Sequence, residues 1–500
     1  MTVWPNPLVA GFYPDPSVVK VGADYYLACS TFEYLPGIPV FHSVDLLSWT
    51  QIGNVVERPG QLASASVPTL GGAWAPTIRH RDGVFYVVVT DAMGRGMLIF
   101  TATQVAGPWS DGTLVAGIHG IDSDLAWGDD GTAYITYSGL DTTSGEPMGP
   151  HKGILQITVD LVTGLPLSEP VSLWSGTGLK FPEAPHLYQH DDFWYLMIAE
   201  GGTERGHGIS VARGLSPAGP FETAGGPPNP ILSARSTNHT VQNTGHGDLV
   251  ETPGGGWAIV LLGMRPAGMT QAFSALGRET YITSARWVDG WLEADPVIIN
   301  PRPGETVVRE GFDGSALSAE WISVRRYPHE VSSLTDRPGW LVVHGAGATL
   351  DAQQPALVGF RQQHPLAEVS VTVDPGVGLG GLSVRYDEDH HYEIEARHGR
   401  VTARACVAGI RQEWSLEIAN GPVVLGLDFV APTGESMLTQ LTSDVVVLSA
   451  GVGADRVELA RVDGRYLSQE TAASFTGRVI GLYAVEGRVA FDDFAYTGRG

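Results

Sequence analysis

The sequence has few basic residues, few cysteines and no long apolar run, and each shortage excludes a class of protein. Its 30 Lys and Arg stand against 54 Asp and Glu, which gives a net charge of −24. A basic surface for nucleic acid or anionic membranes is therefore not expected. No stretch of 18 apolar residues occurs, so no membrane span is expected either.

The two cysteines, Cys29 and Cys406, lie far apart in the sequence. Two cysteines exclude a disulfide scaffold and predict reduced, structural thiols. No CxxC pair and no Cys/His zinc spacing is present. The N-terminus lacks the basic and apolar regions of a signal peptide, which predicts a cytoplasmic protein if Met1 is the natural start. A chain already trimmed of its signal peptide would read the same.

What the chain has in quantity is glycine and proline, with 64 Gly and 33 Pro among its 500 residues. This composition fits many tight turns between short strands, and long amphipathic helices are hard to find. The length suggests two to three domains with ample cores. The acidic balance fits good solubility and a neutral substrate.

A strand–turn–strand pattern recurs roughly every 60 residues through the first part of the chain. Each copy has a small turn, an apolar strand, a Gly or Asp turn, and an aromatic-rich second strand. The five copies begin at Asp15-Pro16-Ser17, Ala75-Pro76-Thr77, Asp122-Ser123-Asp124, Ala184-Pro185-His186 and His246-Gly247-Asp248. Repetition of this kind predicts a radial all-β array, a five-bladed β-propeller.

Equivalent positions of a propeller converge on its axis, so the repeats bring distant carboxylates together. Asp15 and Asp122 occupy the same position in their copies, and Glu183 precedes that position in the fourth. His246 occupies it in the fifth copy. Asp at such turns often only caps backbone amides, but turn chemistry does not explain Glu183. The sequence therefore predicts a site with three carboxylates.

The repeat ends before a Pro- and Gly-rich segment at 300–305, which reads as a linker. The remainder shows short strands that alternate apolar and polar residues, for example at 369–373 and 392–396. Strands of this kind favour a β-sandwich. The prediction is an all-β protein with a propeller at 1–304 and a β-sandwich at 308–500.

Glycoside hydrolysis needs one protonated and one ionised carboxyl group across the scissile bond, and a third carboxylate can raise the pKa of the acid. The chain resembles glycoside hydrolase family 43, in the β-xylosidase-like branch with an appended β-sandwich. The resemblance covers the whole chain and follows the family's order of motifs. The segments that carry it are Tyr13-Pro14-Asp15-Pro16-Ser17, Ser30-Thr31-Phe32-Glu33-Tyr34, Gly72-Ala73-Trp74-Ala75-Pro76, Gly120-Ile121-Asp122, Glu183-Ala184-Pro185-His186, Glu200-Gly201-Gly202-Thr203, Gly245-His246-Gly247-Asp248, Leu276-Gly277-Arg278-Glu279 and Phe475-Thr476-Gly477.

The resemblance implies an inverting mechanism with three catalytic residues. Asp15 would be the general base that deprotonates a water molecule, and Glu183 the general acid that protonates the leaving oxygen. Asp122 would raise the pKa of Glu183. Ala184 and Ser123 stand where relatives more often have Gly, and Pro or Ala, respectively; both residues are small.

The resemblance also implies substrate-binding residues. Phe32 and Trp74 would flank the sugar, although plain core packing would explain both. Thr203 would line the site, and the planar guanidinium of Arg278 would donate to sugar hydroxyls. Phe475 would reach from the sandwich and narrow the entrance; packing inside the sandwich is the alternative.

No cofactor is expected for the chemistry. His246 reads either as a hydrogen-bonded core histidine or, as the resemblance implies, as a metal ligand to a hydrated Ca²⁺ in the propeller channel. Calcium prefers oxygen ligands, so a lone histidine would be unusual coordination.

The predicted function is an exo-acting β-xylosidase on short, neutral xylo-oligosaccharides. The alternatives are an exo α-L-arabinofuranosidase or a bifunctional enzyme, since both sugars can present similar hydroxyls, and a non-catalytic glycan-binding propeller. The presence of all three carboxylates counts against the last. The sequence leaves a homo-oligomer open.

Overall fold

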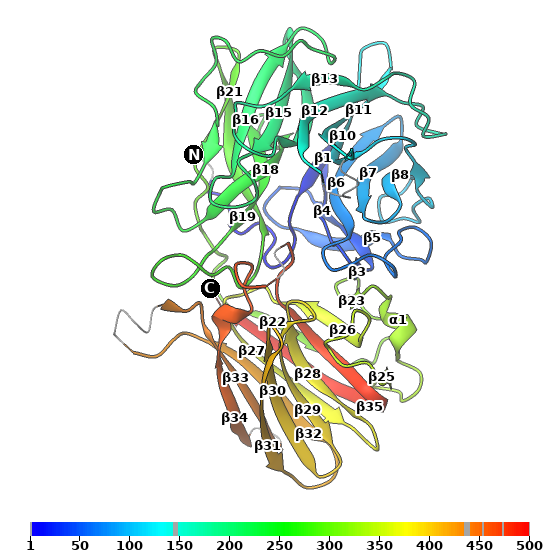
Figure 1. Ribbon diagram of the computed structural model, residues 1–500, viewed down its shortest axis with the longest axis vertical. Helices are drawn as coiled ribbons and strands as arrows, with labels where there is room; N and C mark the ends of the chain where they lie inside the picture. Colours follow the sequence, from blue (N-terminus) through cyan, green and yellow to red (C-terminus); the bar gives the residue numbers. More distant parts are fainter. Residues whose placement is uncertain (1–2, 144–148, 435–440, 453–454, 473–474, 500) are drawn as a thin grey trace.

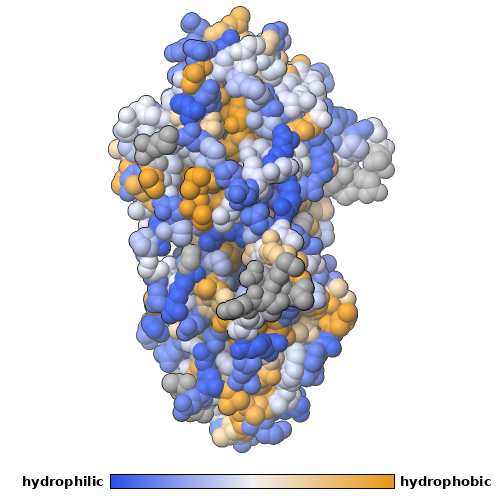
Figure 2. Space-filling view, turned by 90° about the vertical axis from the view of Figure 1, so that its left-hand side faces the viewer, coloured by the Kyte–Doolittle hydropathy of each residue, from blue (hydrophilic) through white to orange (hydrophobic). Residues whose placement is uncertain are grey.

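The computed structural model shows a propeller above a β-sandwich, with the C-terminus near their junction and the N-terminus at the side of the propeller (Figure 1). It describes residues 3–143, 149–434, 441–452, 455–472 and 475–499. Strands dominate both parts, and the described residues include one short α-helix, α1 (Pro328–Val331). No helix in the described ranges is long and apolar enough to cross a membrane. The face in Figure 2 mixes hydrophilic and hydrophobic residues over both parts.

The propeller has five blades, and each blade is a four-stranded antiparallel sheet in sequence order. Blade one contains β1 (Ser17–Val21), β2 (Asp24–Ala28), β4 (Gly37–Ser43) and β5 (Thr50–Val56). Blade two contains β6 (Gly72–Arg81), β7 (Val84–Ala92), β8 (Gly96–Ala102) and β9 (Thr113–Leu114). Blade three contains β10 (Gly120–Trp127), β11 (Ala133–Leu140), β12 (His151–Thr158) and β13 (Val171–Trp174).

The last two blades complete the circle. Blade four contains β14 (Glu183–His190), β15 (Phe193–Glu200), β16 (Gly208–Gly214) and β17 (Leu232–Ser233). Blade five contains β18 (Gln242–Glu251), β19 (Trp257–Met264), β20 (Glu279–Val288) and β21 (Trp291–Ala294). The N-terminal segment returns to this blade, because the amides of Leu8 and Val9 both donate to the carbonyl of Thr280. The predicted propeller is confirmed.

The C-terminal part is a sandwich built around β35 (Val479–Arg499), a strand of 21 residues. Its first half pairs with β26 and β28, and its second half pairs with β22, β25 and β27. One apolar core fills the space between the layers. The predicted sandwich is confirmed. Its elements are β22 (Thr306–Glu310), β23 (Ser323–Val324), β24 (Ser332–Ser333), β25 (Leu341–Ala346), β26 (Ala356–Arg361), β27 (Leu366–Asp374), β28 (Leu379–Arg385), β29 (His390–Arg397), β30 (Arg400–Val407), β31 (Ile410–Glu417), β32 (Val423–Val430), β33 (Val445–Val452), β34 (Asp455–Asp463) and the 3-10 helix η2 (Gly464–Tyr466).

The two parts share a sheet and an apolar cluster. The propeller strand β3 (Tyr34–Leu35) pairs with β23 of the sandwich. The shared cluster joins Phe12 and Tyr34 of the propeller to Leu357 and Tyr483 of the sandwich. Because burying apolar area of this kind is favourable, the sandwich is firmly docked, and its loops can contribute to a site on the propeller.

Candidate active site

In every blade, one residue just before or within the first part of the innermost strand has a left-handed backbone. These residues have φ angles between 45° and 56°, and we call them the first ring: Asp15, Ala75, Asp122, Ala184 and His246. In blades two to five the strand register shifts at or beside this residue. A non-glycine residue with positive φ is strained by about 1–3 kcal/mol. The same costly turn in every blade confirms the repeat register that the sequence indicated.

This turn brings the predicted residues to one small inner chamber on the axis. The chamber has a volume of about 60 Å³. All nine predicted site residues line it, together with Ile121 and His207, which the sequence reasoning missed. The predicted ones are Asp15, Phe32, Trp74, Asp122, Glu183, Thr203, His246, Arg278 and Phe475.

Asp15 is held as a carboxylate by three neighbours. Arg278 Nη1 donates to its Oδ1 at 2.9 Å, and Ser30 Oγ donates to its Oδ2 at 2.6 Å. His246 Nδ1 lies 3.6 Å from Oδ1. Burial alone would raise the pKa of Asp15, but Arg278, His246 and Ser30 more than offset it and hold this pKa below its usual range. Asp15 is therefore ionised and able to accept a proton.

Asp122 and Glu183 behave in the opposite way. Burial, followed by the nearby charge of Asp15, raises the pKa of Asp122 to about 7. Burial, followed by the charges of Asp122 and Asp15, raises the pKa of Glu183 well above its usual range. Groups in one site whose pKa values are driven apart can act as acid and base. Glu183 is suited to hold a proton while Asp15 accepts one.

Three aromatic rings enclose the chamber. The ring of Phe475 stacks on Phe32 with centroids 5.9 Å apart and meets Trp74 edge-on at 5.4 Å. Arg278 lies 5.5 Å and 5.1 Å from the Phe32 and Phe475 rings and donates from Nη2 to the carbonyl of Phe475. Its Nη1 also lies 3.3 Å from Thr203 Oγ1. Phe475 thus joins the propeller site from the sandwich.

The inner chamber adjoins an outer pocket of about 680 Å³. Trp74, Glu183, Thr203 and Phe475 line both spaces. The outer pocket is walled by both parts of the molecule, with Phe181, Arg205 and Gln271 from the propeller and Gln469 and Glu470 from the sandwich. Sequence reasoning missed these residues, because no repeat position marks them. Glu183 lies where the narrow and wide spaces meet.

Both histidines of the chamber are held neutral. Burial lowers the pKa of His207 to about 4 and that of His246 to about 3. His207 Nδ1 lies 3.0 Å from the backbone carbonyl of Asn243, a contact in which the ring nitrogen donates. Arg278 is therefore the principal positive charge that acts on Asp15.

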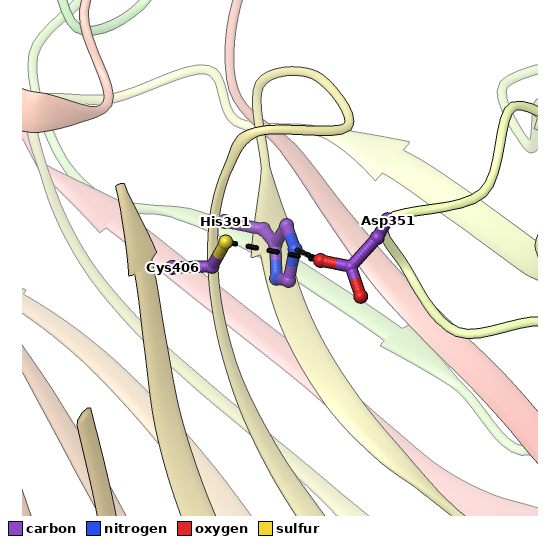
Figure 3. A group of neighbouring side chains, drawn as sticks. All are labelled: Asp351, His391 and Cys406. Carbon is purple, nitrogen blue, oxygen red and sulfur yellow. Dashed lines mark hydrogen bonds and ion pairs between the residues drawn. The ribbon is translucent and has the colours of Figure 1, made fainter. Parts of the chain in front are cut away.

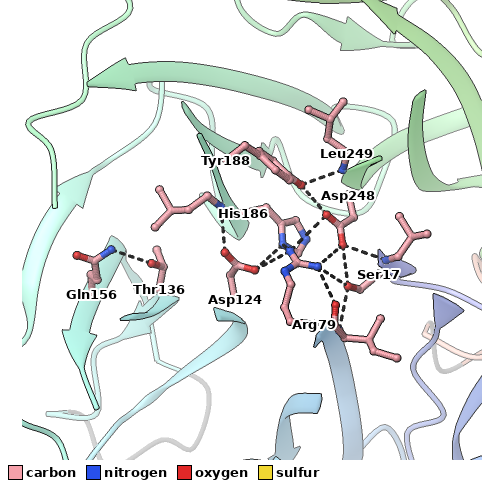
Figure 4. A network of polar contacts seen from close by, with 12 residues as sticks. Ser17, Arg79, Asp124, Thr136, Gln156, His186, Tyr188, Asp248 and Leu249 are labelled. Atoms are coloured by element: carbon pink, nitrogen blue, oxygen red, sulfur yellow. Dashed lines mark hydrogen bonds and ion pairs between the residues drawn. The ribbon is translucent and has the colours of Figure 1, made fainter. Parts of the chain in front are cut away.

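A second ring lies two residues farther along each inner strand: Ser17, Thr77, Asp124, His186 and Asp248. The guanidinium of Arg79, from β6, contacts four of them, Ser17, Asp124, His186 and Asp248 (Figure 4). It donates to Asp124 Oδ1 at 2.7 Å and to Asp248 Oδ2 at 2.8 Å. Burial would raise the pKa values of Asp124 and Asp248, but Arg79 lowers both below their usual range.

The second ring also joins neighbouring blades. Asp248 Oδ2 accepts the amide of Val18, and Ser17 Oγ accepts the amide of Ile78. Asp124 Oδ2 accepts the amide of Leu187 at 2.9 Å. Each acceptor comes from one blade and its donor from the next, so this ring closes the propeller below the chamber.

Comparison with known proteins identifies matches over both parts. Residues 4–292 match the model described as "Glycosyl hydrolases family 43", and residues 309–497 match "Beta xylosidase C-terminal Concanavalin A-like domain". A non-reducing end alpha-L-arabinofuranosidase of Bacteroides ovatus is 34% identical over 96% of this chain and 90% of its own. A xylosidase/arabinosidase of Butyrivibrio fibrisolvens is 30% identical over 99% and 98%. The crystal structure of a xylan beta-1,4-xylosidase from Bacillus halodurans superposes with a TM-score of 0.87 at 28% identity, covering 99% of this chain and 100% of that one.

Proposed function

The chain belongs to glycosyl hydrolase family 43, and from that premise we propose that it is an inverting exo-glycosidase that releases terminal β-D-xylose from short xylo-oligosaccharides. One observation carries this proposal. A narrow chamber holds three carboxyl groups whose pKa values diverge, low for Asp15 and high for Glu183. That is the protonation pattern that glycoside hydrolysis requires.

In the proposed reaction, Asp15 takes a proton from a water molecule, which attacks the anomeric carbon. Glu183 gives its proton to the departing glycosidic oxygen, so the bond to the leaving sugar breaks as the bond to water forms. Asp122 raises the pKa of Glu183 and keeps that proton in place. For inversion, we expect the carboxyl groups of Asp15 and Glu183 to lie about 6.5–9.5 Å apart.

The enclosure supports exo action. We propose that the terminal sugar lies where the inner chamber opens into the outer pocket, beside Phe32, Trp74 and Phe475, with Arg278 and Thr203 at its hydroxyls. The leaving group then occupies the outer pocket beyond Glu183. Phe32 and Trp74 are largely buried and pack in the shared apolar cluster, so they serve packing and the sugar wall together.

An exo α-L-arabinofuranosidase, alone or as a second activity, is the competing proposal. The relatives carry both names, since one is named an arabinofuranosidase and another a xylosidase/arabinosidase. Family membership removes the third alternative, a non-catalytic propeller, because the chain is a glycoside hydrolase with its three carboxyl groups in place.

Calcium at His246 is not well supported by the residues around it. The nearest carboxylate, Asp15, is already bound by Arg278 and Ser30. Deeper in the channel, Asp124 and Asp248 are bound by the fixed positive charge of Arg79. Calcium takes six to eight oxygen ligands, and this set does not fit one. No step of the mechanism passes through a metal, and the chemistry requires no cofactor.

Three further predictions stay proposals. The first is the division of the chain into a propeller at 1–304 and a β-sandwich at 308–500; β21 ends at Ala294 and β22 already begins at Thr306, which supports a junction close to these bounds. The others are the cytoplasmic location and a homo-oligomeric state.

The test compares kcat/KM on p-nitrophenyl β-D-xyloside and p-nitrophenyl α-L-arabinofuranoside, followed by xylobiose as a natural substrate. We expect the xyloside to be preferred and xylobiose to give xylose. The Asp15→Asn variant, purified in parallel, controls for contaminating host enzymes. A preference for the arabinofuranoside would select the competing proposal. Cleavage inside polymeric xylan without release of a terminal sugar would contradict exo action.

A further inference from the structure

A buried histidine and a buried cysteine lie side by side on the sandwich, away from the active site. His391 on β29 pairs directly with Cys406 on β30. The neighbouring residues Tyr392 and Ile394 face the sandwich core. Because side chains alternate along a strand, His391 and Cys406 point to the opposite face. Asp351 reaches them from the loop between β25 and β26 (Figure 3).

The three side chains present one nitrogen, one sulfur and one oxygen to a common point. Asp351 Oδ1 lies 3.2 Å from His391 Nε2 and 3.8 Å from Cys406 Sγ. In a tetrahedral zinc site, bond lengths of about 2.0–2.3 Å place neighbouring ligand atoms about 3.3 Å apart for N and O, and about 3.6 Å apart for S and O. These two distances are close to those of such a site, and all three ligand atoms lie within 4.8 Å of one another.

A carboxylate lies near the second ring nitrogen of His391, at ion-pair distance but without the geometry of a hydrogen bond. This nitrogen, Nδ1, lies 3.2 Å from Glu393 Oε2, and Glu393 is in turn bound by Arg404. A carboxylate behind a ligating histidine fixes the ring and increases its basicity. His391 is 2% exposed at its side chain, whereas Asp351 is 30% exposed, so solvent reaches the trio from the Asp351 side.

The loop that carries Asp351 also contacts the propeller. Leu350 belongs to the apolar cluster shared by the two parts. The carbonyl of Gln353 accepts from Arg325 Nη1, and Gln354 Nε2 donates to the carbonyl of Ala65 in the propeller at 2.7 Å. A link between this loop and strands β29 and β30 would therefore stabilise the part of the sandwich that contacts the propeller.

We propose that Asp351, His391 and Cys406 form a structural site for a borderline-soft divalent cation of the zinc type, with solvent completing its coordination. The mixed N, S and O set favours zinc over calcium or magnesium, which prefer oxygen alone. The cation joins the 347–355 loop to β29 and β30.

Arg411 and a proton compete with this cation. Arg411 Nη2 lies 2.9 Å from Asp351 Oδ1, and its side chain is 52% exposed, so it can move aside into solvent. Asp351 Oδ2 accepts from Thr349 Oγ1 and stays outside the trio. Without a cation, a protonated His391 would bridge Asp351 and Glu393, because the contacts of the ring with Cys406 and Glu393 outweigh its burial and raise its pKa to about 9.

The experiment titrates tag-free, full-length, metal-stripped protein with Co²⁺, a spectroscopic substitute for zinc. We expect one Co²⁺ per chain, with thiolate-to-cobalt charge-transfer absorption and the visible bands of tetrahedral cobalt. Cys406→Ser should lose the charge-transfer absorption completely, and Asp351→Asn should weaken binding. Cys29→Ser is the matched control and should keep the absorption, because Cys29 is buried in the propeller. Arg411→Gln should bind Co²⁺ more tightly, since a competing positive charge is removed.

A second measurement follows thermal unfolding of the same proteins with Zn²⁺ and with a chelator. Zn²⁺ should raise the melting temperature of the wild type and of Cys29→Ser, and leave that of Cys406→Ser unchanged. No charge-transfer absorption with excess Co²⁺ would overturn the proposal and leave the trio as an ion-pair network. So would absorption that persists in Cys406→Ser.

Discussion

Both rings on the propeller axis carry carboxyl groups, but only the second ring holds all of its carboxyl groups in the ionised state. Asp122 in the first ring and Glu183 beside it have raised pKa values, and Asp15 has a lowered one, whereas Asp124 and Asp248 in the second ring both have lowered pKa values. Both rings are buried, so burial does not distinguish them. The difference is the cation: Arg79 contacts both second-ring carboxylates, while Arg278 contacts only Asp15.

The comparison shows how one strand can supply both chemistry and closure. On β10, Asp122 faces the chamber and Asp124, two residues later, accepts the amide of Leu187 in the next blade. Alternation along the strand keeps both residues on the axial side. Arg79 makes the deeper carboxylate a fixed structural anion, whereas Arg278, the arginine of the chamber, contacts Asp15 and leaves Asp122 and Glu183 able to exchange protons.

The largest effect should come from removing the ionised carboxylate of the first ring. Asp15→Asn should lower kcat about a hundred- to ten-thousand-fold on every substrate, because Asp15 is the chamber carboxyl group whose pKa is lowered and which is assigned to accept the proton of water. Steady-state kinetics on activated and natural substrates measure this loss, with circular dichroism to verify folding. A variant that retains more than about a tenth of wild-type kcat would remove Asp15 from the role of base.

Replacing the protonated member, Glu183, should have an effect that depends on the leaving group. Glu183→Gln should lower kcat on xylobiose about a hundredfold or more, since its leaving sugar oxygen needs the proton. The loss of kcat on a nitrophenyl glycoside should be much smaller, because nitrophenolate leaves without needing a proton. The ratio of the two losses is the measurement. Equal losses on both substrates would argue against general-acid action.

Removing the cation of the second ring tests the structural half of the comparison. Arg79→Gln should lower the free energy of unfolding by about 3–5 kcal/mol, because it leaves Asp124 and Asp248 buried without their partner. Chemical denaturation measures this loss. Arg81→Gln, on the same strand but partly exposed, is the matched control and should change stability by less than about 1 kcal/mol. Equal stability of the two variants would contradict the structural role of Arg79.

The smallest effect is a shift in a pH profile. Glu183 must be protonated to act as an acid, so its pKa sets the pH at which kcat/KM falls on the alkaline side of the pH profile (the alkaline limb). Asp122→Asn removes a negative charge that raises this pKa, so the limb should move to lower pH, by about one unit. Asp124→Asn, on the same strand, should leave the limb in place. A limb that stays fixed in Asp122→Asn, or moves equally in both variants, would remove the distinction between the rings.

Much of the first ring could be predicted from the sequence, because each blade repeats one local turn around it. Asp15, Asp122 and His246 hold equivalent positions, and Glu183 precedes the fourth. The second ring could have been predicted equally well from the sequence. The residues two positions farther along in each repeat are Ser17, Thr77, Asp124, His186 and Asp248. Arg79 could not be found this way, since it lies off the repeat position and reaches the axis through a long side chain.

Contacts that depend on pairing between distant strands were not readable from spacing. Cys406 looked like an isolated structural thiol, because no Cys/His spacing surrounds it. Its neighbour His391 is set by the register of β29 and β30, and Asp351 by a loop closing over them. The outer pocket was missed for the same reason, since Arg205 and Glu470 come together only when the sandwich docks.

The stereochemistry of the first product tests the central claim most directly, because Asp15 as base and Glu183 as acid require single displacement by water. Proton NMR during rapid hydrolysis of a β-xyloside, recorded before mutarotation, identifies the anomer released. The account predicts α-xylose first, with β-xylose appearing only as the sugar equilibrates. β-Xylose as the first product would mean that a carboxylate attacks the sugar, and would contradict the assignment of Asp15 as a base.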